Sequence, residues 1–392
     1  MRPRSLRDVP AQRLAYRFEA DTSAPPEALA DEAAKLSSVQ ADFDTRRKDD
    51  ALVRTVLSPD GQRALALYET GDVQRGEFRI DMYAADGTFL RNLTPVELSG
   101  AFGPTVAWSP DGHNIAFIGR KSLTPTPTPT PLDALPELIT ETPTASPSVA
   151  PVFAPVAVYS TEQIYICNRD GFDLRPLTTR EGLIYFHIAW APDGHALAAL
   201  ACREDEWNAR EKEFRLPVGR PRLIGMDGRE RLLDDGLTEA LPVWSPDSST
   251  VATAFDTDVA IYDAATDTPT GARIPLREPL LAASAAYDEK ISQKSKKTTA
   301  TSGGAATEKA PQTDSPPVSF NPIVRLEWTQ PESLFVQTAY VRTYPNDPVH
   351  NFPRWHVLHL SPQAALLSSQ VLSHQTRFAF LSQLLTNVTH NG

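Results

Sequence analysis

Cysteine is almost absent from this chain of 392 residues. Its two cysteines, Cys167 and Cys202, are too few to form a disulfide framework. Both lie in apolar stretches typical of strands, QIYICN and ALAALAC, where a free cysteine behaves as a small buried hydrophobic residue. We therefore expect buried, unreactive thiols. One disulfide between them is left open, although their spacing gives no argument for it.

Long apolar runs and an excess of basic residues are also lacking. No run of 18 or more apolar residues occurs, so we expect no membrane-spanning helix. The N-terminus, MRPRSLRDVPAQRLAYRFEAD, has no apolar core and shows no secretory signal. We therefore expect a cytoplasmic protein, or a periplasmic one if the true start lies upstream. The net charge of −11 argues against a nucleic-acid partner, because binding phosphates requires clustered lysine and arginine.

Sequence motifs of catalysis are missing as well. The chain has no G-x-S-x-G nucleophile elbow, no phosphate-binding P-loop, no H-E-x-x-H and no C-x-x-C. His356 and His359 are three residues apart on an expected strand, so they face opposite sides and cannot easily share a metal ion. The sequence therefore predicts neither an enzyme nor a protein with a cofactor or a metal.

Proline, in contrast, is abundant, with 35 residues, and four of these prolines stand in a repeated turn. VLSPDGQRALALY, VAWSPDGHNIAFIG, IAWAPDGHALAAL and PVWSPDSSTVATA each indicate a strand, a tight turn and a second strand. The turn aspartates are 51, 82 and 54 residues apart, and the middle interval falls to 45 without the 37-residue stretch 121–157, which is rich in proline and threonine. A period of about 40–55 residues is typical of four-stranded propeller blades.

Each repeat continues with a second hairpin. FRIDMYAADGTFLRNLTP and QIYICNRDGFDLRPLTT are examples in which Asp-Gly stands between alternating apolar residues. This pattern is the strongest local signal for a hairpin. One repeat therefore reads as strand, Ser-Pro-Asp-Gly turn, strand, loop, strand, Asp-Gly turn and strand.

The repeated turn residues have structural explanations. Proline presets its own φ, aspartate accepts local backbone N–H groups and glycine adopts a positive φ. We assign this role to Pro59, Asp60, Gly61, Pro110, Asp111, Gly112, Pro192, Asp193, Gly194, Pro246 and Asp247. A tryptophan that recurs just before the turn proline is best explained by packing between blades. These tryptophans are Trp108, Trp190, Trp244 and Trp328.

Weaker copies of the repeat follow the four clear ones. Residues 323–339 and 354–360 supply three strands, and 370–382 resemble half a repeat. The N-terminal strand 12–21 could complete this half repeat and so close the ring. We therefore predict an all-β fold, a β-propeller of four-stranded blades with six blades, seven being the alternative.

The expected domain boundaries follow from this count. A strand and a helical segment occupy residues 1–50, the propeller occupies 51–382 and a tail occupies 383–392. The apolar residues of 22–50 recur at helical spacing, which predicts a helix packed on the propeller; a helix that docks a partner and a disordered segment are the alternatives.

The repeats resemble those of a known family. VAWSPDGHNIAFIG, with RNLTP and RPLTT at the ends of second hairpins, resembles the WD-like repeat of TolB-type propellers. It is similar, more distantly, to the non-catalytic propellers of prolyl-oligopeptidase-type enzymes. The resemblance covers residues 53–280 well and 323–382 poorly. It implies the propeller fold and no particular function, because such propellers have many unrelated roles.

Three long insertions interrupt the repeats. Composition predicts disorder in 121–157 and 282–320, whereas 203–220 is charged and carries two aromatic residues on one potential helix face. These insertions, and the gap 341–353, fall between the second and third strands of a repeat or between two repeats. We therefore expect all of them on one face of the propeller, opposite the short turns.

Loops on a rigid scaffold carry function more often than the scaffold itself. We therefore predict a non-catalytic scaffold that binds another protein through this long-loop face. The candidate contact residues are Phe186, His187, Trp207, Arg210 and Phe214. Two alternatives stay open: an accessory or degenerate propeller of a peptidase-type enzyme, and a propeller that binds a small ligand or glycan.

Overall fold

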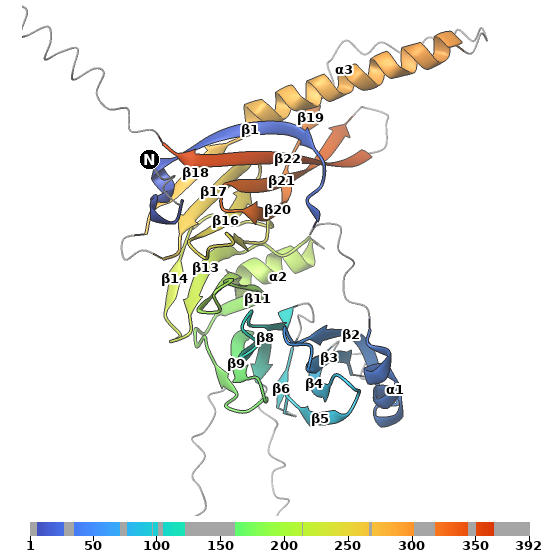
Figure 1. The fold of residues 1–392 in the computed structure, drawn as a ribbon, viewed down its shortest axis with the longest axis vertical. Helices are drawn as coiled ribbons and strands as arrows, with labels where there is room; N and C mark the ends of the chain where they lie inside the picture. Colours follow the sequence, from blue (N-terminus) through green and yellow to red (C-terminus); the bar gives the residue numbers. More distant parts are fainter. Residues whose placement is uncertain are drawn as a thin grey trace, which may run out of the picture. The chain divides into compact units, whose positions relative to one another are not determined.

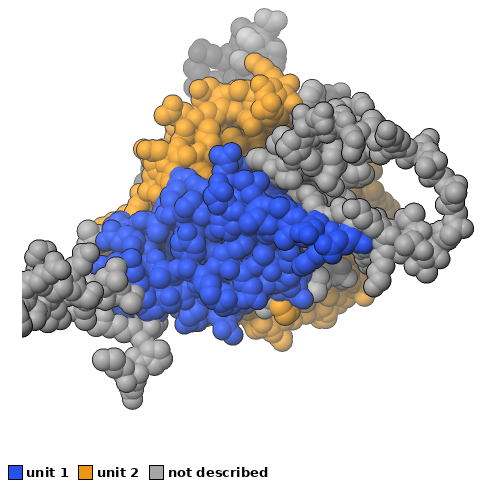
Figure 2. Space-filling view, turned by 90° about the horizontal axis from the view of Figure 1, so that it is seen from above, with its two compact units in different colours: residues 1–25, 245–252, 256–392 blue, residues 26–244, 253–255 orange. Residues whose placement is uncertain are grey.

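Over the residues that it describes, the structure, a computed structural model, consists of β-sheets with three α-helices (Figure 1). It describes residues 6–26, 35–70, 77–95, 97–100, 105–121, 161–213, 215–265, 269–301, 318–343 and 350–363. The chain forms two compact units, coloured separately in Figure 2. Unit 1 comprises residues 1–25, 245–252 and 256–392, and unit 2 comprises residues 26–244 and 253–255.

Two sheets of unit 2 consist of four consecutive antiparallel strands. The strands of the first sheet are β2 (Ala51–Leu57), β3 (Arg63–Glu69), β4 (Phe78–Ala84) and β5 (Phe89–Asn92). Those of the third sheet are β11 (Leu183–Trp190), β12 (Ala196–Arg203), β13 (Arg220–Gly225) and β14 (Glu230–Leu232). In both sheets the strands follow the order expected of a propeller blade.

The second and fourth sheets repeat this order. In the second, a short extra strand, β6 (Leu98–Ser99), pairs with β8. The other strands of the second sheet are β7 (Ala107–Trp108), β8 (Asn114–Lys121), β9 (Gln163–Asn168) and β10 (Arg175–Pro176). Those of the fourth are β15 (Val243–Trp244), β16 (Thr250–Phe255), β17 (Asp258–Asp263) and β18 (Gly271–Pro275).

The fifth sheet takes its last strand from the N-terminus. It joins β20 (Ile323–Gln330), β21 (Ser333–Thr343) and β22 (His350–Pro362) to β1 (Leu14–Thr22). A further strand, β19 (Val318–Phe320), pairs with β21. The hypothesis that 12–21 complete a repeat with 370–382 is therefore wrong, because β1 pairs antiparallel with β22 from Leu14 opposite Pro362 onward. Residues 370–382 lie outside the described residues.

The core of unit 2 lies between successive sheets. One apolar cluster joins the first sheet to the second, for example Leu65 and Met82 to Phe117. Another joins the second sheet to the third, for example Ile164 to Leu197. Four-stranded sheets that pack face to face in chain order are the architecture of a propeller, so the predicted fold class is confirmed. The number of blades stays a prediction.

The Ser-Pro-Asp-Gly turns close the first two strands of each repeat by hydrogen bonds. At the first turn, Asp60 Oδ1 accepts the hydroxyl of Ser58 at 2.6 Å and the N–H of Gln62 at 3.0 Å. The N–H of Gly61, which has a φ of +66°, donates to Ser58 O at 2.8 Å. The Ser58 hydroxyl is the first cause that lowers the pKa of Asp60 to about 2. This aspartate is therefore a fixed acceptor within the turn.

The repeated tryptophans connect neighbouring sheets. The Nε1–H groups of Trp108, Trp190 and Trp244 each donate to a carbonyl on the first strand of the preceding sheet. The acceptors are Val56 at 3.2 Å, Ala107 at 3.3 Å and Ala189 at 3.0 Å. Trp328 is also buried, but its Nε1 has no hydrogen-bond partner among the described residues.

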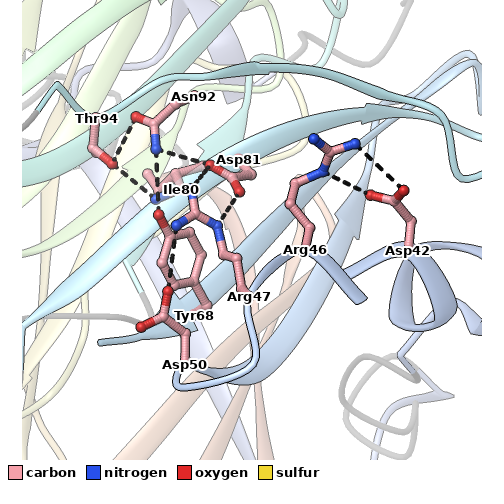
Figure 3. Close-up of polar contacts among 9 residues, drawn as sticks. All are labelled: Asp42, Arg46, Arg47, Asp50, Tyr68, Ile80, Asp81, Asn92 and Thr94. Atoms are coloured by element: carbon pink, nitrogen blue, oxygen red, sulfur yellow. Dashed lines mark hydrogen bonds and ion pairs between the residues drawn. The ribbon is translucent and has the colours of Figure 1, made fainter. Parts of the chain in front are cut away.

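Helix α1 (Ser37–Arg46) packs on the first sheet through the buried side chains of Val39 and Phe43. Directly after the helix, Arg47 forms two hydrogen bonds with the fully buried carboxylate of Asp81, at 2.6 and 3.0 Å (Figure 3). Asn92 donates to the same carboxylate at 2.9 Å. These polar contacts hold the end of α1 against strands β4 and β5.

Helix α3 (Arg277–Thr301) corrects the prediction of disorder in 282–320 for its first part. Its first turns bury Leu280, Ala283 and Ser284, and Asn321 Nδ2 donates to the carbonyl of Leu280 at 3.3 Å. The alanine- and leucine-rich stretch PLLAASAA has high helix propensity. The prediction of disorder relied instead on the low content of large apolar residues in this insertion. Residues 302–317 of this insertion lie outside the described residues, as do 122–160.

Two short 3-10 helices, η1 (Leu6–Asp8) and η2 (Ala11–Arg13), precede β1. The N–H of Ala11 donates to the buried carboxylate of Asp263 on β17 at 3.0 Å. The N-terminal segment therefore contacts β17 of the fourth sheet and β22 of the fifth.

Candidate functional site

The connections between strands differ sharply in length. The first strand of a repeat joins the second, and the third joins the fourth, through the short turns described above. The long connections join the second strand to the third or one sheet to the next, as α2 (Glu204–Lys212) does between β12 and β13 and α3 between β18 and β19. In an antiparallel sheet these two kinds of connection lie at opposite ends of the strands. We call the end with the long connections the long-loop end.

Within unit 2, helix α2 is an element at the long-loop end that is not part of the four-stranded repeat. Glu206 accepts the backbone N–H of Arg203 at 2.9 Å, which caps the first turn. Glu204 and Asp205 lie in the first turn and Arg210 and Lys212 in the last, an order that the helix dipole favours. A charged insertion therefore forms a helix although it buries none of its residues fully.

Trp207 fixes α2 to the third sheet. Its ring lies 5.9 Å from that of Phe186, measured between centroids, and packs on a small apolar cluster that includes Ile184 and Cys202. Phe186 is the extra residue of a β-bulge, because its neighbours Tyr185 and His187 pair with the consecutive residues 201 and 200. The bulge and the helix thus form one local packing unit.

Ion pairs fix the two ends of the insertion. Glu206 receives two hydrogen bonds from the guanidinium of Arg220, both at 2.8 Å, and this bonding lowers its pKa. Arg210 forms an ion pair with Glu239, and its Nε donates to the carbonyl of Leu216 at 2.9 Å. The chain that leaves α2 is therefore held beside residue 239, which belongs to the connection between the third and fourth sheets.

Of the predicted contact residues, Phe186 packs on Trp207 of α2 and Arg210 lies on the same helix, but these side chains are engaged within the chain. Phe186 is buried and packs on Trp207, and Arg210 binds Glu239. His187 is half-buried, and burial lowers its pKa to about 4, so it is neutral at pH 7. Phe214 lies outside the described residues. Whether any of them contacts a partner stays a prediction.

The sequence analysis missed the most exposed apolar side chains beside α2. These are the leucines Leu216, Leu237 and Leu241. The signal that could have revealed two of them is the segment LTEAL, in which two leucines four residues apart lie on the same face as Glu239 if the segment is extended.

Two kinds of reactive group concern the described residues, metal-binding clusters and thiols. Over these ranges, no group of three histidine, cysteine or acidic side chains could hold a metal ion. Cys167 and Cys202 are free and buried, as predicted, and burial raises the pKa of each thiol to about 12. Neither thiol therefore forms a nucleophilic thiolate at neutral pH. Of the helices in the described part of the chain, none is both long enough and apolar enough to cross a membrane.

Comparison with known proteins gives structural likenesses only. No family model and no curated protein matches the chain. Among solved structures, it is similar to a TolB candidate from Agrobacterium tumefaciens, at 16% identity and a TM-score of 0.29, over 57% of this chain and 67% of that one. An oligogalacturonate lyase from Vibrio parahaemolyticus matches at 8% identity and a TM-score of 0.37, over 78% of this chain and 65% of the other.

Prolyl oligopeptidase B from Galerina marginata matches at 10% identity and a TM-score of 0.41, over 85% of this chain. The chain spans 39% of the length of that enzyme. Scores at this level support no inference about activity. The assignment of this chain to the propeller type rests on its own four-stranded sheets.

Proposed function

We propose that this chain is a non-catalytic β-propeller scaffold that binds another protein through its long-loop end. The observation that carries the proposal is helix α2. Its residues Glu204, Asp205, Asn208 and Glu211 are exposed, and the third sheet would be complete without it. Trp207 and two ion pairs nevertheless hold it in one position, and such a preformed element loses little entropy when a partner binds.

The opposite end of the sheets is a weaker candidate. The side chains of its turns are used within the turns, as the hydrogen bonds of Asp60 show. Arg169 also forms an ion pair with Asp60 at 2.7 Å, which links the first turn to a turn of the second sheet. These contacts explain the turn residues without a partner.

The test is affinity capture of the full chain from its native host, followed by reconstitution with the purified partner. In one variant, Glu204→Lys, Asp205→Lys and Glu211→Lys reverse three exposed charges of α2. A control variant places lysine at three exposed positions of the opposite end, Gln62, His113 and His195. We expect a stoichiometric partner that the control retains and the α2 variant loses. A partner that binds the α2 variant as tightly as the unaltered chain would contradict the proposal.

A further inference from the structure

Strand β1 lies at the edge of the fifth sheet. Among the strands that the structure describes, it pairs with β22 alone (Figure 1). None of its nine residues is buried. Asp21, near the end of the strand, has a φ of +57°, a conformation that residues other than glycine rarely adopt. Because this strand buries little apolar surface and contains a strained residue, its release costs less than the release of a central strand.

Polar contacts fix the register of β1 on β22. The carboxylate of Asp21 accepts a hydrogen bond from Arg354 Nε at 2.7 Å, and the side chain of Arg354 is only 7% exposed. Glu19 Oε2 lies 2.8 Å from Nε2 of His359. A strand without acidic residues at these two positions would break both contacts. The edge of β22 therefore fits the sequence of β1 and not every extended segment.

The place of β1 in the chain allows it to pair with a second copy. Residues 1–25 belong to unit 1, whereas the residues that follow them directly, 26–244, belong to unit 2. The N-terminal segment is therefore joined covalently to the rest of its own unit only through the other unit. An element of this kind can pair with the same unit of another molecule if the link between β1 and α1 changes its course.

We propose that two copies of this chain exchange their N-terminal segments, so that β1 of each copy pairs with β22 of the other. The occupant of the β22 edge is then an identical strand, which supplies Asp21 and Glu19 in the same register. Because the contacts of the segment within unit 1 are kept, the exchanged dimer differs from the monomer chiefly in the link between β1 and α1. A higher protein concentration therefore favours the dimer.

The inference is independent of the proposed function, since it concerns the fifth sheet and not helix α2. Loss of the partner of α2 would leave strand exchange unaffected, and absence of strand exchange would leave the scaffold function standing.

The test mixes two single-cysteine variants of the full chain, Arg17→Cys and His359→Cys. The two positions face each other in the register of β1 and β22, and both side chains are at least partly exposed. A short bismaleimide reagent joins the two introduced thiols efficiently when β1 of one chain lies on β22 of the other. The native cysteines, Cys167 and Cys202, are buried and their thiols have raised pKa values, so they do not compete.

Two controls accompany this mixture. The double variant Arg17→Cys, His359→Cys should give a cross-link within one chain, which shows that the reagent spans the pair. A mixture of Arg17→Cys with Val324→Cys should give only background, because Val324 is 46% exposed on β20, which pairs with β21.

After the folded variants are mixed at high concentration, we expect the cross-link between positions 17 and 359 of different chains at least about tenfold above the control mixture. Mass spectrometry of the linked peptides identifies it. Sedimentation of the unaltered chain should show a dimer whose fraction rises with concentration.

A cross-link that forms in the double variant but not in the mixture would overturn the inference. A dimer of the unaltered chain without this cross-link would do the same, since its interface would lie elsewhere. A double variant that gives no cross-link would contradict the pairing of β1 with β22 on which the inference rests.

A second substitution tests the fit of the strand. Asp21→Asn, added to the Arg17→Cys chain, should lower the yield of the mixed cross-link several-fold, because the altered strand competes poorly with the other chain's own β1 for Arg354. Ala20→Ser, at an exposed position of the same strand, is the matched control and should leave the yield unchanged. Equal yields from the two variants would show that the edge of β22 does not select this strand.

Discussion

His356 lies on β22 with its ring fully buried. Its Nδ1 accepts the backbone N–H of Asp21 at 3.2 Å, so the proton of the neutral ring is on Nε2, which lies 3.1 Å from the hydroxyl of Thr338. Burial, and then the charge of Arg354, lower the pKa of His356 to about 4. Protonation of Nδ1 would place a second donor against the N–H of Asp21 and break the contact between β1 and β22.

This arrangement predicts that acid destabilises the fold. Between pH 6.5 and about pH 4, His356 binds a proton in the unfolded chain but not in the folded chain. The contribution of His356 to the free energy of unfolding is therefore complete above pH 6.5 and is lost as the pH falls through this interval. The loss between pH 7 and 5 is at most about 2 kcal/mol for this residue. Urea unfolding at the two pH values measures it.

The variant His356→Gln should show a smaller difference between the two pH values. His195→Gln is the control, because this side chain is 85% exposed. His187, whose pKa burial also lowers to about 4, should retain its own share of the pH dependence in both variants. A His356→Gln protein with the full pH dependence would show that His356 is not a source of it.

Sequence reasoning at this scale succeeds where a residue acts within its own turn. The repeat predicts that Asp60 is a turn acceptor, since its partners are two residues away on either side. It predicts that Trp108 packs between sheets, but not that its Nε1 donates to Val56, because that bond depends on the position of a carbonyl 52 residues earlier.

At the scale of elements, α1 depends on one buried ion pair. Asp81 is fully buried, and burial raises its pKa, while Arg47 and Asn92 oppose this effect by hydrogen bonding to the carboxylate. The guanidinium of Arg47 also stacks over the ring of Tyr68, 4.2 Å from its centroid. The pair thus joins the end of the helix to two strands of the first sheet.

The variant Arg47→Met should therefore destabilise the chain by about 3 kcal/mol, because it leaves a buried carboxylate without its charge partner. Arg46→Met is the matched control. Arg46 pairs with the partly buried Asp42 of the same helix and lies over the ring of Phe89, so its loss should cost much less than the loss of Arg47. Urea unfolding of both variants measures the difference. Equal losses would mean that the pair with Asp81 does not anchor the helix.

The helices show where sequence periodicity works and where it fails. Val39 and Phe43 recur at helical spacing, so α1 is predicted in type. The anchor between Arg47 and Asp81 is not, because the two residues are 34 positions apart. In α3 the buried positions are Leu280, Ala283 and Ser284, of which only Leu280 is large and apolar, so the apolar period is weak.

At the scale of the whole molecule, the N-terminal segment completes the last sheet. It contributes β1, whose side chains are half-buried or exposed and which pairs with β22 over most of its length. Asp21 pairs with Arg354, and Ala11 binds Asp263. Backbone pairing and a few polar contacts, rather than deep apolar burial, therefore hold this strand.

Removal of residues 1–22 should expose the edge of β22 and leave Arg354 without Asp21. We expect faster amide exchange in residues 355–362, a lower melting temperature and a tendency to aggregate through the open edge. Removal of residues 1–5 alone is the control and should change none of these. Unaltered exchange in β22 after the longer truncation would show that β1 contributes nothing to the stability of the fifth sheet.

Much of the fold and part of the site can be predicted from the sequence. The Ser-Pro-Asp-Gly repeat predicts the order of strands because each hairpin is local. It also places α2 at the end with long connections. The exposure of Leu237 escapes prediction, since it depends on the bridge between Thr238 and Gly219. The partner of β1 escapes it as well, since any open sheet edge could have accepted that strand.

The pairing of β1 with β22 has a consequence for synthesis on the ribosome. Strands β2 to β5 can meet soon after they leave the ribosome, because their partners are neighbours in the chain. Leu14 cannot pair until Pro362 has been translated, and translation of the roughly 350 residues between them takes on the order of 20 to 70 s. During that time β1 is an unpaired strand on a nascent chain. The fifth sheet therefore forms only after β22 has been translated, and a chaperone that covers β1 would act before that moment.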